Sequence, residues 1–345
     1  MSTLSKSPLR VARQALAVGH KALPQYAHQF SPKKFTQPQL FACLVLKTFF
    51  KTDYRGLVAH LDDNFDLRAV LGLRIVPHFT TVQKASRRLL RIPAARRLFR
   101  TTVRRFLKRR RRVRRAALDS TGLECGHRSF YYVRRRNGYP KRWQTVAYSR
   151  YAKLEASFEC STHLLLAVLV GRGPRVDVDR FVPLLDATLD QVRLGAALAD
   201  AGYDSEPNHR HAREQRGVRS FIPASSGRPS PKPPVGRYRR QMKQRLTKDY
   251  GRYGQRWQAE TGFSMLKRRV AACVHGQTYW SQCRELLLIA ITYNIMLLYA
   301  AIGFLQSTPD PFLSFGVEPP GSGSYFFWSV GAAGFSGGGP IRTAT

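Results

Sequence analysis

The apolar positions in the first third of the chain recur with the period of short helices. Residues 1–35 are basic and weakly patterned, and Pro24 and Pro32 interrupt any long helix, so we expect a basic N-terminal arm. The helical period begins at Thr36, a residue suited to cap a helix, and Pro38 fits the first turn. Further helices are predicted at residues 54–61, 67–71 and 81–90.

A dense run of arginines follows these helices. Residues 97–115 are predicted to form a helix crowded with basic side chains, among them Arg109, Arg111 and Arg112. A solvated linker is the alternative, but the density of the run favours contact with phosphate groups. The segment 36–115 fits a helical, helix-turn-helix-like DNA-binding domain with a basic linker, or equally well a helical cap on the domain that follows.

After residue 115 the hydrophobic pattern changes from that of helices to that of strands. Strands are predicted at residues 116–119, 147–158, 163–170, 195–199 and 219–223. Helices are predicted at residues 179–192 and 208–216. Consecutive strands followed by strands that alternate with helices predict an α/β fold, with a mixed sheet flanked by helices.

The remaining pattern predicts a loop, two helices and a tail. A flexible loop rich in Pro, Gly and Ser is expected at 225–238, and a long basic and aromatic helix at 243–272. The apolar helix at 285–304 contains polar residues, so we favour a buried helix over a membrane span. Residues 305–345 are rich in Gly without any period, and we expect a disordered tail.

The charge of the chain narrows the class of partner. Its 345 residues include 58 Lys and Arg against 21 Asp and Glu, a formal net charge of +37. Such a chain repels itself unless a polyanion neutralises much of the charge, and the planar guanidinium of Arg suits phosphate oxygens. We therefore expect nucleic acid as the partner. The five cysteines are scattered without a C-x-x-C pair, so neither a disulfide framework nor a structural zinc site is expected.

Two aspartates stand at the predicted ends of buried strands. Asp119 lies in the segment LDSTG and Asp200 in the segment ADAGYDS. Burying two carboxylates without a partner is costly, so a divalent cation is their natural partner if the strands are neighbours. Glu124, Asp204 and Glu206 lie close by in the sequence and are rival ligands.

A third acid lies on a polar stripe of the long predicted helix. Arg256, Glu260 and Lys267 follow Tyr253 by 3, 7 and 14 residues. At about 100° per residue, these positions fall within an arc of roughly 60° on one helix face. Core stripes are apolar, so this face is either solvated or part of a site.

These motifs resemble those of the DDE transposases of bacterial and archaeal insertion sequences, in the branch with the signature Y-x2-R-x3-E-x6-K. The segment from Tyr253 to Lys267 matches that spacing in full, and Asp119 and Asp200 match the other two motifs in the expected order. The resemblance covers residues 36–304. Relatives often carry a strand-rich insertion before the Glu helix, where this chain has only the Pro-rich loop.

The resemblance implies a ribonuclease-H-like catalytic domain at residues 116–304. Asp119, Asp200 and Glu260 would be the catalytic residues and would hold two Mg²⁺ ions, for which Mn²⁺ can substitute. These ions would activate the attacking hydroxyl and stabilise the leaving oxygen.

The same resemblance implies DNA-binding roles for the rest of the signature. Arg256 and Lys267 would hold phosphates, and Tyr253 would position a strand. Three tryptophans are candidates for stacking on bases: Trp143, Trp257 and Trp280. A core position is nevertheless the expectation for each.

The function favoured by the sequence is that of an insertion-sequence transposase, which binds terminal inverted repeats and catalyses metal-dependent cleavage and transfer of DNA strands. The alternative is a catalytically inactive, transposase-derived DNA-binding protein. An RNA-binding protein fits less well because no RNP-type motif is present. We expect double-stranded DNA as the partner, a homodimer on DNA, and a cytoplasmic, nucleoid-associated location without a membrane anchor.

Overall fold

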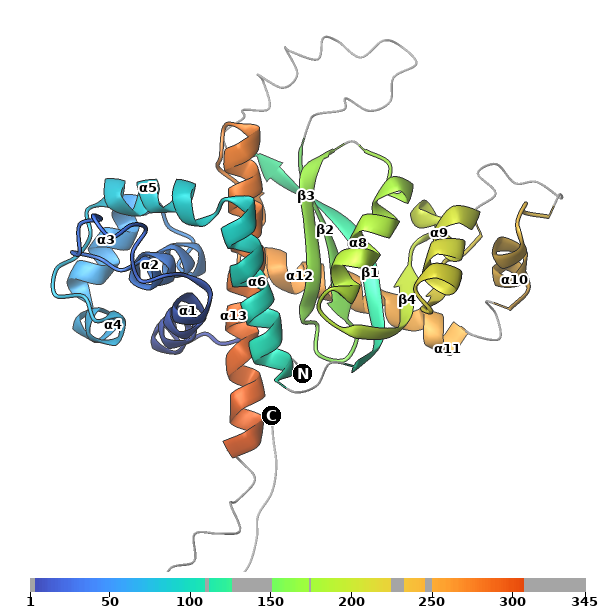
Figure 1. Ribbon diagram of the computed structural model, residues 1–345, viewed down its shortest axis with the longest axis horizontal. Coiled ribbons are helices and arrows are strands. Elements are labelled where there is room, and N and C mark those ends of the chain that lie inside the picture. Colours follow the sequence, from blue (N-terminus) through green and yellow to red (C-terminus); the bar gives the residue numbers. More distant parts are fainter. Residues whose placement is uncertain are drawn as a thin grey trace, which may run out of the picture. The chain divides into compact units, whose positions relative to one another are not determined.

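The computed structural model describes residues 4–108, 112–125, 151–173, 175–224, 233–245 and 250–306. In these ranges an N-terminal set of helices is followed by a mixed sheet flanked by helices (Figure 1). The expected α/β fold class is therefore confirmed. The predicted disordered tail lies outside the described residues from residue 307 onward.

The N-terminal helices follow the predicted pattern from Thr36 onward. Their bounds are α1 (Pro8–Ala22), α2 (Gln37–Phe49), α3 (Tyr54–Asp63), α4 (Phe65–Leu71), α5 (Phe79–Leu89) and α6 (Ile92–Leu107). α2 begins with a capping box, because Thr36 Oγ1 accepts the backbone N–H of Gln39 while the Gln39 side chain accepts that of Thr36. α3, α4 and α5 confirm the three helices predicted after α2.

Helix α1 occupies part of the segment in which a basic arm was expected. Its apolar residues Val11, Ala15 and Val18 are buried, and the helix packs against α2, α4 and α13. Gly19 allows the close approach to α2, since a Cβ there would lie 3.0 Å from the Cα of Pro38. The spacing of these apolar residues is that of an amphipathic helix, which the many basic residues around them obscure.

The sheet mixes antiparallel and parallel strands. Its members are β1 (Arg112–Cys125), β2 (Tyr151–Glu159), β3 (Leu165–Gly173), β4 (Arg193–Ala199), β5 (Arg219–Phe221) and β6 (Cys273–Val274). The order is β3-β2-β1-β4-β5, with β6 paired to the far part of β1. β1, β2 and β3 are antiparallel neighbours, whereas β4 and β5 join β1 by parallel pairing. Helices connect the parallel strands of the sheet, as the alternation of strands and helices in the sequence predicted.

The prediction that the arginine run at 97–115 forms one helix is wrong. α6 ends at Leu107, and Arg112 already begins β1. The reason is the alternation after residue 111: Val113 is buried between the exposed Arg112 and Arg114, and β1 pairs with β4 from Arg112 onward. Arg109 and Arg111 lie outside the described residues.

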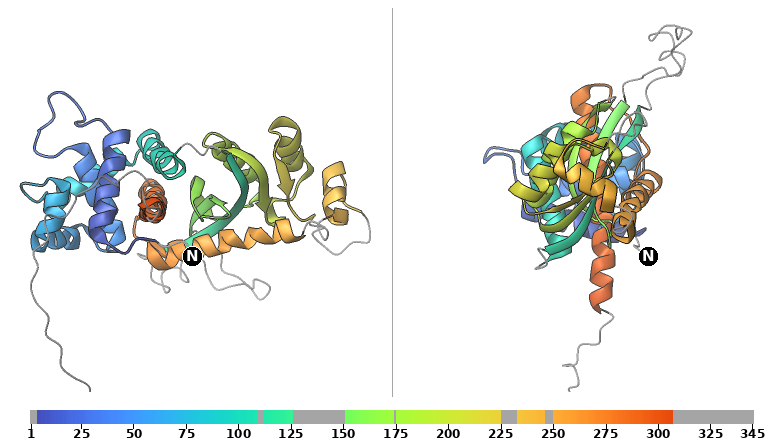
Figure 2. Two further views of the ribbon diagram at one scale, coloured as in Figure 1. Left: turned by 90° about the horizontal axis from the view of Figure 1, so that it is seen from below. Right: turned by 90° about the vertical axis from the view of Figure 1, so that its right-hand side faces the viewer.

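Helices cover both faces of the sheet. η1 (Val178–Arg180) and α8 (Phe181–Leu189) lead into β4, and α9 (Glu206–Arg210) continues as the π-helical turn η3 (His211–Gln215) before β5. α12 (Trp257–Arg269) crosses the face opposite α8 (Figure 2). Strand alternation agrees with this placement: Glu155 of β2 pairs with Arg180 beside α8, whereas Phe158, of opposite parity, meets Gly262 of α12.

Helix α13 (Tyr279–Gln306) packs against α1, α2 and α6 as well as β3, and lies between the N-terminal helices and the sheet (Figures 1 and 2). Its polar residue Asn294 is fully buried. The Asn294 side chain accepts the N–H of Leu165, and its amide donates to the Leu165 carbonyl and to Thr102 Oγ1. Asn294 therefore joins α13 to β3 and α6. Among the described residues no helix is both long and apolar enough to cross a membrane.

The helix predicted at 243–272 is helical over 243–245 and 250–269 but contains a 3₁₀ turn, and residues 246–249 lie outside the described residues. The structure has α10 (Arg237–Arg245), α11 (Tyr250–Tyr253), the 3₁₀ turn η4 (Gly254–Arg256) and then α12. η4 separates Tyr253 from Glu260, so the predicted stripe is interrupted between its first and third members.

Candidate active site

Asp119 and Asp200 lie side by side because of the register of β1 and β4. The last residues paired in parallel between these strands are Leu118 and Ala199, and each aspartate comes next in its own strand. Asp200 leaves the end of β4, as expected. Asp119 does not end β1, which continues to Cys125; it stands where the pairing with β4 stops. Both aspartates thus lie at the carboxyl end of β4.

Alternation along β1 determines the face on which Asp119 lies. Ala117 is paired with Phe158 of β2, and Asp119 is two residues further along β1, so all three share one face of the sheet. That is the face crossed by α12, where a Cβ on Gly262 would lie 2.5 Å from the Phe158 ring. Asp119 therefore points toward the side of the sheet that carries Glu260.

Close packing brings the Glu260 segment to the aspartates. η4 contacts both β1 and β4, and α12 contacts β1 and β2. Gly262 lets the helix approach the ring of Phe158, and Phe263 packs edge-on against the same ring at a centroid distance of 4.9 Å. The Gln258 side chain bonds to the ring of His163 in the turn between β2 and β3. The acid of the third motif is thus held beside the edge at which the two aspartates meet.

The electrostatics of Asp119 reflect this arrangement. Burial raises the pKa of the Asp119 carboxyl to about 6, although the backbone N–H of Ser120, at 2.8 Å, and the charge of Arg256 act in the opposite direction. The negative charges of Asp200 and Glu260 raise the pKa further. Asp200 and Glu260 are therefore close enough to disfavour the charge of Asp119.

Glu260 is engaged with Arg256 in this structure. A guanidinium nitrogen of Arg256 lies 2.6 Å from Glu260 Oε1, one helical turn away. Among the described residues no three His, Cys, Asp or Glu side chains converge closely enough to hold a metal ion. The Glu260 side chain is 58% exposed, and exposed pairs of this kind contribute at most about 1 kcal/mol, so little free energy opposes its release toward the aspartates.

The rival acids near the aspartates have other partners. Asp204, 1% exposed, is gripped by the guanidinium of Arg239 at 2.7 Å. The Glu206 carboxylate accepts the backbone N–H groups of Tyr238 and Arg239 at the start of α10. Glu124 stands on β1 opposite Cys273 of β6, well past the end of β4. Asp204 and Glu206 thus fasten α10 to the body of the protein.

Two ion pairs, each with one buried partner, lie under the site and were missed by the sequence reasoning. Lys153 Nζ is 2.7 Å from Asp177, and Arg180 is 2.6 Å from Glu155. Glu155 is paired in register with Ser120, the residue after Asp119, and points to the face opposite α12. No motif joins these four residues in the sequence, because the chain reversal between β2 and the segment before α8 brings them together.

Tyr203 is a further buried residue at this position. Its side chain comes from the same segment as Asp200, and its pKa is raised by burial first and then by the charges of Asp177, Asp119 and Glu155. The ADAGYDS segment could have indicated it, but a buried tyrosine after a strand is more often a core residue.

Of the other candidate residues, Tyr253 lies near enough to Arg256 to interact with its charge. Tyr253 and Lys267 are half-buried, and Arg112 is exposed at the start of β1. Trp143 lies outside the described residues. The core position expected for two other tryptophans is wrong, because Trp257 is 54% and Trp280 59% exposed. Trp257 begins α12, beside Arg256, and is free to contact a ligand.

The sheet consists of an antiparallel β1-β2-β3 meander extended by the parallel strands β4 and β5. Two aspartates lie where β1 and β4 stop pairing, and a helix that carries an acid crosses the sheet beside them. These features define a ribonuclease-H-like domain of the DDE type. Residues 111–295 match the family described as Transposase DDE domain, and the chain belongs to that family. The comparison with curated proteins gave no match. Membership makes this a DNA transposition enzyme with DNA as partner, and implies a divalent metal.

The residues present fit such a metal. Carboxylate oxygens are the ligands that hard divalent cations prefer. Asp119 is half-buried with a raised pKa, and within the described ranges no basic side chain forms an ion pair with it. A cation between Asp119 and Asp200 would favour the ionised form of Asp119 and so offset the effect of burial on its pKa.

Proposed function

We propose that this chain is the transposase of an insertion sequence of the Y-x2-R-x3-E-x6-K branch, and that it binds the terminal inverted repeats and cleaves and transfers DNA strands there. The observation that carries the proposal is the register that sets Asp119 beside Asp200, on the face of the sheet crossed by the Glu260 helix. A net charge of +37 supplies the attraction for DNA.

Asp119, Asp200 and Glu260 would hold the divalent cations, two Mg²⁺ or Mn²⁺ ions. When bound, these ions activate the attacking water or 3′-hydroxyl and stabilise charge on the leaving oxygen. Asp119 must be ionised for this role, and its position at the end of the β4 pairing fixes its orientation. Asp200 and Glu260 are exposed, which leaves the site open to a duplex.

Arg256 would have two roles in turn. In this structure its guanidinium neutralises Glu260. Once Glu260 turns toward a cation, the same guanidinium becomes free to hold a DNA phosphate through two parallel hydrogen bonds. The exposed ring of Trp257 next to it would stack on a base near the cleaved bond, and Lys267 and Tyr253 would contact the backbone further along the strand.

The test is cleavage of DNA that carries the ends of the element. With Mg²⁺, the wild-type protein should nick such a duplex at the terminal repeat, whereas Asp119→Asn should lose nearly all of this activity and keep its affinity for DNA. Asp190→Asn, which removes an exposed carboxylate at the end of α8, is the matched control and should cleave normally. Absence of cleavage by the wild type, or undiminished cleavage by Asp119→Asn, would contradict the proposal.

One observation favours a second candidate function. Because Glu260 is paired with Arg256 and the described acids form no metal cluster, the chain could bind DNA without cutting it. A transposase-derived DNA-binding protein of this kind would bind the ends with equal affinity in Mg²⁺ and in EDTA. It would not nick DNA in the presence of any divalent cation, including Mn²⁺.

A further inference from the structure

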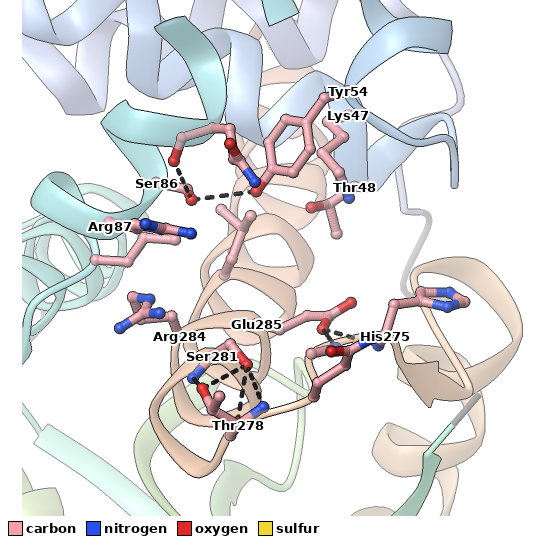
Figure 3. Close-up of a pocket in the computed structure, with 15 residues that line it drawn as sticks. Lys47, Thr48, Tyr54, Ser86, Arg87, His275, Thr278, Ser281, Arg284 and Glu285 are labelled. Atoms are coloured by element: carbon pink, nitrogen blue, oxygen red, sulfur yellow. Dashed lines mark hydrogen bonds between the residues drawn. The ribbon is translucent and has the colours of Figure 1, made fainter. Parts of the chain in front are cut away.

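A pocket separate from the candidate active site lies where the N-terminal helices meet the start of α13. Its volume is about 630 Å³ (Figure 3). The lining comes from α2, from the start of α3 and from the second half of α5. The segment 275–288, which spans the loop before α13 and the first turns of that helix, completes it. None of the three candidate catalytic acids lines it.

The ionisable side chains that line this pocket are mostly basic. Lys47, Arg87, His275 and Arg284 contribute to it, against Glu285 as its single acid. The Glu285 carboxylate is already used, since it accepts the backbone N–H groups of His275 and Gly276, each at 2.9 Å, and so fixes the loop before α13.

Arg87 and Arg284 are the two side chains in the pocket that call for a ligand. They come from α5 and α13 and lie on the same side of the pocket (Figure 3). Within the part of the chain that the structure describes, neither guanidinium has a hydrogen-bond or ion-pair partner. Two such charges side by side repel each other, and an anion between them would turn that repulsion into attraction.

One wall of the pocket is fixed in advance. The Tyr54 hydroxyl donates to Ser86 Oγ at 3.1 Å, and Ser86 in turn donates to the Gln83 carbonyl. The Lys47 ammonium lies 5.1 Å from the centre of the Tyr54 ring, so it adds positive charge to the wall while it is itself packed. A site that needs no rearrangement on binding loses less conformational entropy.

We infer that this pocket binds a backbone phosphate of DNA, and that Arg87 and Arg284 are its principal ligands. The inference rests on the proposed function, because it takes the same DNA as ligand. A phosphate held here would be gripped by the N-terminal helices and by α13 together, at a position distinct from the scissile bond.

Counterion release provides the test. In the Asp119→Asn background, which prevents cleavage, the affinity for a duplex carrying the element's end is measured over a series of KCl concentrations. Loss of one phosphate contact lowers the slope of log Kobs against log [KCl] by about 0.9. We expect Arg87→Ala and Arg284→Ala each to lower the slope by this amount and to weaken binding roughly tenfold. Arg284→Lys keeps the charge and should keep the slope.

Arg219→Ala is the matched control, since it removes the same charge from an exposed position at the start of β5 and should leave the slope unchanged. Pocket variants with the wild-type slope, or a control that lowers the slope equally, would overturn the inference. Thermal unfolding of each variant verifies that it is folded. Because only binding is measured, a pocket without effect would leave the proposed cleavage intact, and failure of cleavage would leave the slopes readable.

Discussion

At the scale of single residues, the candidate site is a compromise between stability and chemistry. Asp119 is half-buried beside Asp200 and Glu260, and its pKa is raised to about 6 by burial and by those two charges. The ionised form needed to hold a cation is therefore the form that the fold disfavours. Sites built to bind a ligand often carry such a cost in the free protein.

This leads to a prediction for metal-free protein. The pKa of Asp119 is about 6 in the folded state against 3.8 in the unfolded state, so between these values the folded state binds more protons and stability falls as pH rises. Above pH 6 the full penalty applies, on the order of 3 kcal/mol. Asp119→Asn removes it, and should raise the melting temperature at neutral pH by a few degrees.

Below about pH 4 both states of the wild type are protonated at this position, and the substitution should have little effect on stability. Calorimetry in EDTA at neutral pH and below pH 4 measures the difference in melting temperature between Asp119→Asn and the wild type. An equal shift in melting temperature at both would show that the effect does not come from the charge of Asp119.

Residue-scale prediction from the sequence succeeded where the signal is local. Asp200 follows a buried apolar run and leaves the end of β4, as inferred, whereas Asp119 was expected at the end of its strand and instead lies within β1, where the pairing with β4 stops. Lys153 and Glu155 gave no such signal. They alternate with apolar residues like any half-exposed strand, and their partners Asp177 and Arg180 are found only when the chain is folded.

At the scale of elements, α12 determines whether the third acid reaches the first two. The approach of this helix to the sheet depends on Gly262, because a Cβ there would lie 2.5 Å from the ring of Phe158. That ring has no room to turn, since Phe158 is fully buried and packs edge-on against both Phe263 and Tyr293. Any side chain at residue 262 must therefore push the helix outward.

Gly262→Ala should displace α12 and carry Glu260 away from Asp119. We expect a loss of about 1–3 kcal/mol in stability from overpacking and a fall in end cleavage of at least about tenfold. Gly251→Ala is the control, because a Cβ at that glycine of α11 meets nothing within 4 Å. Phe158→Leu should partly restore cleavage in the double variant. Full activity of Gly262→Ala would mean that the packing of α12 does not position Glu260.

The boundaries of helices and strands were predicted well in some segments and poorly in others. Helices α2 to α5 were predicted because capping residues and apolar spacing agree. The arginine run and the 243–272 segment were each assigned to one helix because basic residues hide the change of period. In the fold, Val113 is buried where β1 pairs with β4, and η4 contacts both β1 and β4. Tertiary contacts decided both outcomes.

At the scale of the whole molecule, charge is the dominant property. Each chain carries a formal net charge of +37, so two copies repel strongly at low ionic strength unless DNA lies between them. Transposition nevertheless brings two ends of an element together. We therefore expect copies of the chain to assemble on DNA, which neutralises the charge that keeps free copies apart.

We predict that the protein is monomeric in free solution at low salt and becomes a dimer when duplexes carrying the element's end are added. Light scattering coupled to size exclusion, with the Asp119→Asn variant to prevent cleavage, should give the mass of one chain without DNA and of two chains with two duplexes. An unrelated duplex of the same length should yield complexes without a fixed stoichiometry, because phosphate contacts alone carry no sequence information.

A single chain on each end at saturating DNA would contradict the prediction and imply that each end is cut independently. A stable dimer without DNA at low salt would show instead that apolar contacts between copies outweigh the repulsion of their charges.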